Sequence, residues 1–104
     1  MALGGNLTVE GNGHSCESGF YGYFGGAPGG MVPVPIFTWR NLTCTNSFFQ
    51  VRDGARVSCG GLTMASTNTK GPEYLVTMNG VFYHGAGTYP GDQPGVASAG
   101  GQVQ

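Results

Sequence analysis

Glycine and proline recur so often that they interrupt almost every segment of helical length in this chain. Of its 104 residues, 21 are glycine and 6 are proline. Inside a helix, glycine is less favourable than alanine by about 1 kcal/mol and proline by about 3 kcal/mol. The apolar residues also lack the three-to-four-residue spacing of a helix face. We therefore expect an all-β fold.

Short runs rich in valine, threonine, phenylalanine and tyrosine, separated by turn dipeptides, indicate the kind of β fold. This pattern is typical of antiparallel sheets. Six or seven short strands favour a small antiparallel sandwich, a jelly-roll-like pair of sheets or a small barrel. The length fits one domain over 1–104. We expect a β core over about 31–84, a glycine- and aromatic-rich segment over 11–30, and a glycine-, proline- and glutamine-rich C-terminal arm over 85–104.

Two dipeptides predict tight turns. Asp53-Gly54 lies between the strand-like runs 46–52 and 55–59, and Asn79-Gly80 lies between 73–78 and 81–84. Such residues adopt the positive φ of a type I′ turn, which joins adjacent antiparallel strands. The sequence therefore predicts two β-hairpins.

The run 31–39 contains two prolines at alternate positions, Pro33 and Pro35. Since alternate residues of a strand point their N–H groups the same way, both prolines remove donors from the same edge. We expect an edge strand, or a polyproline-like arm, that pairs on one side only and is protected against further pairing.

The three cysteines form neither a disulfide framework nor a zinc ribbon, because their number is odd and no two have CxxC spacing. At most one bridge and one free thiol are possible. In the hairpin register, Cys44 and Cys59 fall about 13 Å apart, beyond the reach of a disulfide, so we expect this pair to be unbridged. His14 and Cys16 resemble half of a metal site, but two further ligands are missing, so no metal is expected.

Charge and motif content exclude several functions. Only 9% of the residues are charged and the net charge is −1, so no basic surface is available for nucleic acid. No apolar run has the length of a signal peptide or membrane span. The carboxylates are scattered, and no nucleophile or phosphate-loop motif is present, so we expect no enzyme, no catalytic residues and no cofactor. His84 is interpreted as a half-buried strand residue.

The aromatic cluster over 20–24, with Trp39 and Tyr89, allows three interpretations. Its rings can close the core, anchor another protein, or form a stacking platform for sugars. The segments 11–30 and 85–104 offer little apolar surface, so we expect them to be ordered only against a further surface.

We therefore favour a non-enzymatic structural protein of a larger assembly. The specific hypothesis is a small phage capsid decoration (cement) protein, or another accessory virion protein, made in the host cytoplasm. Its partners would be a capsid or other lattice protein and copies of itself. The alternative is an extracellular lectin-like module that recognises glycans. The interface candidates are Phe20, Tyr21, Tyr23, Phe24, Val32, Val34, Ile36, Phe37, Trp39 and Tyr89.

Overall fold

The computed structural model describes residues 5–21, 33–84 and 86–104, and in this part of the chain every strand pairing is parallel. No helix occurs among these residues, so the all-β prediction is confirmed there, whereas the predicted antiparallel pairing is wrong. The strands are β1 (Leu7–Glu10), β2 (Ser15–Tyr21), β3 (Ile36–Val51), β4 (Arg56–Ser58), β5 (Thr63–Lys70), β6 (Tyr74–Val76), β7 (Val81–Tyr83), β8 (Ala86–Gly87), β9 (Val96–Ala97) and β10 (Gln102–Val103).

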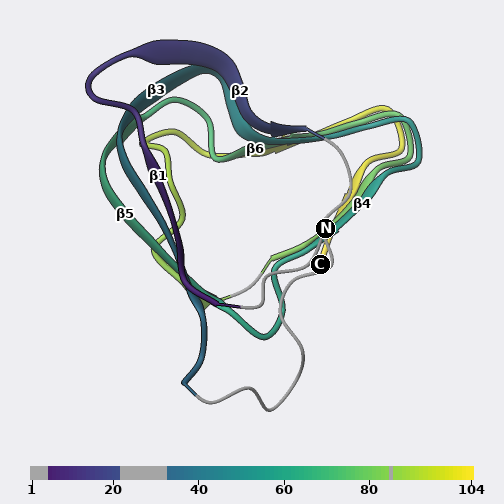
Figure 1. Ribbon diagram of the computed structural model, residues 1–104. Helices are drawn as coiled ribbons and strands as arrows, with labels where there is room; N and C mark the ends of the chain where they lie inside the picture. The colour runs from purple at the N-terminus through teal and green to yellow at the C-terminus, as the bar shows by residue number, and fades with distance from the viewer. Residues whose placement is uncertain (1–4, 22–32, 85) are drawn as a thin grey trace.

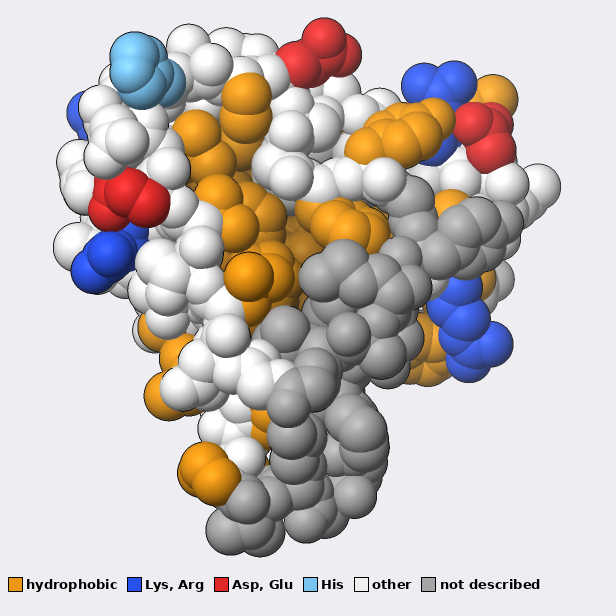
Figure 2. Space-filling view, in the orientation of Figure 1, with side chains coloured by type: hydrophobic (Ala, Val, Ile, Leu, Met, Phe, Trp, Pro, Cys, Tyr) orange, Lys and Arg blue, Asp and Glu red, His pale blue; other side chains and the backbone are white. Residues whose placement is uncertain are grey.

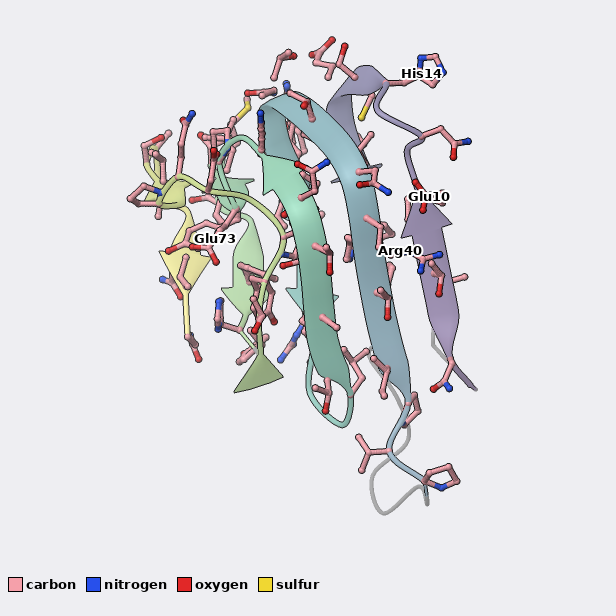
Figure 3. All side chains as sticks on the ribbon, turned by 90° about the vertical axis from the view of Figure 1, so that its left-hand side faces the viewer. Glu10, His14, Arg40 and Glu73 are labelled. Atoms are coloured by element: carbon pink, nitrogen blue, oxygen red, sulfur yellow. The ribbon has the colours of Figure 1, made fainter. Side chains whose placement is uncertain are left out.

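The chain winds into stacked coils, so each strand lies beside its counterpart in the next coil. On one side of the molecule Leu7 pairs with Phe37, Phe37 with Met64, and Met64 with Gly87. Figure 1 looks along the stack and shows the coils lying over one another around a roughly triangular outline. Figure 3 shows β1, β3 and β5 side by side on one face. The architecture is a parallel β-solenoid rather than a sandwich or jelly roll.

The long strand β3 belongs to two faces of the solenoid. Its first half pairs with β1 and β5, and its second half pairs with β2 and β6. It bends at Asn41, which has a φ of 53°, and positive φ recurs at Asn12 and Asn68. Asparagine tolerates this conformation better than most residues. The Asn68 side-chain amide donates to Asn41 Oδ1 at 3.0 Å, so the corners of successive coils are also hydrogen-bonded.

A second column of turns closes the coils at the opposite side. The central pairs Asp53-Gly54, Met78-Asn79 and Ala99-Gly100 all have positive φ. The first turn is closed by Ala55 N–H donating to the Arg52 carbonyl at 3.0 Å. The turn at Asp53-Gly54 is therefore confirmed, and the second predicted turn lies one residue earlier than expected.

The hairpins predicted around these turns are nevertheless wrong. After the first turn β4 pairs with β7, and before it the end of β3 pairs with β6. Gly54 N–H donates to the Met78 carbonyl at 3.0 Å, which links one turn to the next. The flanking strands thus direct their hydrogen bonds along the stack to the next coil instead of toward each other.

The core lies inside the coils and is centred on Phe49, which is fully buried. Its ring stacks on Phe82 with centroids 5.6 Å apart and meets Trp39 edge to face at 5.5 Å. Phe20 from the first coil and Tyr89 from the fourth both lie 6.1 Å from it. One aromatic cluster therefore spans the whole stack.

The proline-containing run does not form an edge strand. β3 begins at Ile36, after both prolines, and Phe37 has a paired neighbour on each side. Pro35 is buried, and its carbonyl accepts from Thr63 N–H at 2.9 Å. Because both prolines precede the ladder, their missing donors do not limit its pairing.

The C-terminal segment needs no outside surface to be ordered. Its strands β8, β9 and β10 pair with β5, β6 and β7 and so form the fourth coil. His84 N–H donates to the Gln104 carbonyl, and Gln104 N–H donates to the Phe82 carbonyl, both at 2.8 Å. Backbone hydrogen bonds within the chain thus compensate for the entropy lost when the C-terminal segment is ordered. We had expected a partner protein to do so. In the other glycine-rich segment, residues 11–21 form a turn and β2, while 22–30 lie outside the described residues.

Candidate functional site

The structure divides the interface candidates into buried and exposed residues. Phe37, Trp39 and Tyr89 are only 3%, 1% and 5% exposed, so their side chains belong to the core and cannot anchor a partner in this fold. The burial of Trp39 and Tyr89 fits the core-closure interpretation of the aromatic residues, and Phe37 lies in the same core. Phe20 is partly buried and packs on the same core. Tyr23, Phe24 and Val32 lie outside the described residues.

Three of the candidates are exposed: Tyr21 at 59%, Val34 at 52% and Ile36 at 42%. Tyr21 ends β2, whereas Ile36 begins β3 and Val34 precedes it. The structure therefore does not bring all ten candidates into one surface. Sequence reasoning gave too much weight to aromatic residues, because a ring suited to an interface is equally suited to a core.

The first coil presents the longer of the two open sheet edges. Within the described residues, β1 and β2 pair only with β3 and have no partner on their other side. At the opposite end of the stack, β8, β9 and β10 have only two residues each. Very short edge strands are poor templates for further pairing. The four-residue β1 and the seven-residue β2 therefore form the stronger candidate for an interaction edge.

Apolar side chains lie between these two edge strands. Leu7, Val9 and Phe20 are only partly buried and pack against the core. Figure 2 looks onto the first coil and shows hydrophobic atoms gathered in the middle of this face. Hydrogen-bonding edges next to an apolar centre are the combination used when a protein accepts an added strand. We name the residues 7–10 and 15–21 the first-coil edge.

One corner of the first-coil edge is held by a charged cluster. Arg40 Nε lies 3.3 Å from Glu10 Oε1, and Figure 3 shows the two side chains on the same face. Glu10 also accepts from the Asn12 N–H at 2.9 Å and from the Asn41 amide at 3.1 Å. The Asn12 bond is the largest cause that lowers the pKa of Glu10, followed by Asn41. The ionised carboxylate thus ties β1 to the second coil.

The two histidines lie in different surroundings, and His84 is an exposed residue after β7 rather than the half-buried strand residue that we expected. His14 is exposed at the corner that follows β1 (Figure 3). His84 stacks on Tyr89 with ring centroids 3.8 Å apart and lies edge to face against Phe82 at 5.9 Å. Nowhere in the described ranges do three His, Cys, Asp or Glu side chains converge as metal ligands.

A shallow groove of about 470 Å³ lies beside the fourth coil. Its lining includes two carboxylates, Glu73 and Asp92. Asp92 Oδ1 accepts from Gly71 N–H at 2.8 Å, and Glu73 N–H donates to the Gln93 carbonyl at 3.1 Å. These hydrogen bonds attach the loop before β9 to the third coil, which gives this part of the lining a structural role.

Sequence reasoning missed the pairing of Cys16 with Cys44. The two residues are direct neighbours in the ladder between β2 and β3, and their Sγ atoms lie 3.4 Å apart. All three cysteines are free thiols, and Cys59 is buried elsewhere. Cys16 and Cys44 become neighbours only when the coils stack with parallel strands. The expected antiparallel pairing did not place them side by side.

Comparisons of the chain with protein-family models, curated proteins and solved structures found no significant match. In the described part of the chain, no helix is long and apolar enough to cross a membrane. The functional argument therefore depends on the geometry of the first-coil edge.

Proposed function

We propose that this chain is a non-enzymatic structural module of a larger protein assembly and that its first-coil edge pairs with a second copy of the chain. The observation that supports the proposal is the unpaired side of β1 and β2 in the described structure, next to partly exposed apolar side chains. An added strand would satisfy the backbone groups of this edge and cover the apolar centre. The specific assembly that we propose is a phage capsid or other virion lattice, on which the chain acts as a decoration protein.

The partner at this edge is a second copy of the chain in our proposal. Two copies that meet edge to edge about a two-fold axis use the same surface on both subunits, so the contact closes as a dimer. The low charge favours this arrangement, because 9% charged residues and a net charge of −1 produce little repulsion between copies. The C-terminal coil is the weaker partner for this contact, since its strands β8, β9 and β10 have only two residues each.

The glycan alternative loses one of its candidate residues, because Trp39 is 1% exposed and cannot stack on a sugar ring. Of the aromatic cluster over 20–24, Tyr21 is the exposed member among the described residues. Within the described residues the cluster thus offers one exposed ring, so we retain the assembly proposal.

A backbone substitution tests the edge directly. Gly11 N–H donates to the Arg40 carbonyl at 2.8 Å, and strand alternation therefore directs the Thr8 N–H away from β3. Thr8→Pro removes this outward donor without removing a donor to β3, and Thr8→Ala is the matched control that keeps the N–H. Sedimentation velocity over a concentration series should show a dimer for the natural chain and for Thr8→Ala.

Thr8→Pro should remain monomeric, and at concentrations where both variants are monomeric its circular dichroism and unfolding midpoint should stay close to those of Thr8→Ala. A natural chain that is monomeric at every concentration would overturn the self-association. A dimer that persists in Thr8→Pro would place the contact elsewhere. The virion part is tested separately by immunogold labelling of purified phage particles that encode the chain, and unlabelled particles would refute it.

A further inference from the structure

Cys16 and Cys44 lie in the arrangement that precedes a disulfide between two coils. They occupy paired positions on the adjacent strands β2 and β3, and 3.4 Å separates their sulfur atoms. Adjacent strands lie about 4.7–4.9 Å apart, and a disulfide accepts Cα separations of about 4.4–6.8 Å. The backbone spacing is therefore suitable, and the sulfur atoms need to approach to about 2.0 Å.

The surroundings of Cys16 allow this approach. β2 has a paired neighbour only on the β3 side within the described structure. Its register against β3 shifts directly after Cys16, between Cys16 and Ser18. An edge strand at an irregularity can adjust with less loss of pairing than a central strand. Cys59 does not compete, because it is buried in another part of the fold.

We propose that Cys16 and Cys44 are a redox modification site that forms a reversible disulfide and joins the first coil covalently to the second. This inference does not depend on the proposed assembly, because it concerns bonds within one chain.

The oxidant that we propose is a low-molecular-weight disulfide such as oxidised glutathione. The Cys16 thiolate attacks one sulfur of this molecule, which forms a mixed disulfide and releases one small thiolate. Cys44 then loses its proton, and its thiolate attacks the Cys16 sulfur. The second small thiolate leaves and takes up a proton. In the net reaction two protein thiols are oxidised, and one small disulfide is reduced to two thiols.

The exposure of the two thiols determines the order of these steps. Cys16 is exposed, whereas Cys44 is fully buried, so only Cys16 meets the oxidant directly. Burial, together with the neighbouring Cys16 thiol, raises the pKa of the Cys44 thiol to about 12, so Cys44 is protonated at neutral pH and gives up its proton in the resolving step. The exposed residue therefore acts first and the buried residue resolves the intermediate.

The experiment uses a Cys59→Ser variant, which leaves only the two cysteines of the pair. The folded protein is equilibrated in glutathione buffers of increasing potential, blocked with an alkylating reagent and analysed by intact mass and peptide mapping. Both thiols should disappear together, with the loss of two hydrogens and a cross-linked peptide pair. The residues are 28 positions apart, so oxidation should lower the unfolding equilibrium constant by up to roughly 400-fold, less any strain in the bond.

Cys16→Ser in the same background is the matched control, because Cys16 is exposed and its replacement leaves the core intact. In this control the buried Cys44 should stay reduced while the chain is folded, and oxidised glutathione should not change stability. A lasting mixed disulfide on Cys16, a disulfide between two chains, or no reaction in the folded Cys59→Ser protein would each overturn the proposal.

Discussion

Removal of the Phe49 ring should be among the most damaging single changes to this fold. The side chain is fully buried and contacts rings from every coil, including Phe20 from the first and Tyr89 from the fourth. Replacement of a core phenylalanine by alanine costs about 3–5 kcal/mol, and each aromatic pair adds about 0.5–1.5 kcal/mol beyond area burial. We therefore expect Phe49→Ala to lower the free energy of unfolding by about 4 kcal/mol or more.

This loss is large compared with the total stability, which is about 5–15 kcal/mol for a chain of this size. Urea unfolding measures it, with a slope of about 2 kcal/mol per molar for a small domain. The midpoint should fall by about 2 M. Trp39, the only tryptophan, is buried and therefore reports unfolding by fluorescence. Because the Trp39 ring contacts Phe49, the substitution also changes the surroundings of the fluorescent ring. Circular dichroism should therefore be recorded in parallel.

Two further variants control the measurement. Tyr21→Ala removes an aromatic ring that is 59% exposed, so its effect should stay within about 0.5 kcal/mol. Phe49→Leu keeps most of the apolar volume and should cost less than Phe49→Ala. If Phe49→Ala unfolds within about 1 kcal/mol of the natural chain with an unchanged slope, the ring does not hold the coils together as we argue.

Three other predictions concern backbone and charge. Gly71→Ala should lower the free energy of unfolding in urea by roughly 3 kcal/mol or more, because Gly71 has a φ of 123° and the new Cβ would meet the Cys44 carbonyl oxygen. Gly54→Ala is the control and should cost about 1 kcal/mol, because Gly54 has a φ of 74° and open space around its Cβ position. The pKa of Glu10 is lowered from its ordinary 4.5, so stability should fall as the pH drops below 4.5, and Glu10→Gln should weaken this dependence in acid titrations followed by circular dichroism. Burial raises the pKa of Cys59 from 9.0 to about 11, so stability should fall as the pH rises from 9 toward 11, and less so in Cys59→Ala.

The sequence predicted the turns better than the pairing. Asp53 and Gly54 adopt positive φ because their residue types allow it, and this preference is local. The partner of a strand is not a local property, since both parallel and antiparallel ladders have side chains alternating with a period of two. The same residues that predict a hairpin can therefore close a coil.

The coils also lack a constant repeat that the sequence could reveal. Leu7 pairs with Phe37, 30 positions away, whereas Met64 pairs with Gly87, 23 positions away. A search for a fixed period fails when each coil has its own length. Trp39 is buried against Phe48 and Phe49 inside the coils, and its neighbour in the ladder, Ser66, lies in the next coil. The candidate site could be predicted only in part for the same reason, because the first-coil edge exists only when the strands are parallel.

The long separation between paired residues has a consequence for the speed of folding. The ladder contacts of the described strands join residues that are 21 to 30 positions apart, from Val81 with Gln102 to Leu7 with Phe37. Each coil must therefore close a loop of this length before its hydrogen bonds can form, and nonlocal β topologies fold in about milliseconds to seconds. β3 is the strand that all of β1, β2, β5 and β6 must find. Its early ordering would give both halves of the molecule a common template, from which the outer coils can be added one after another.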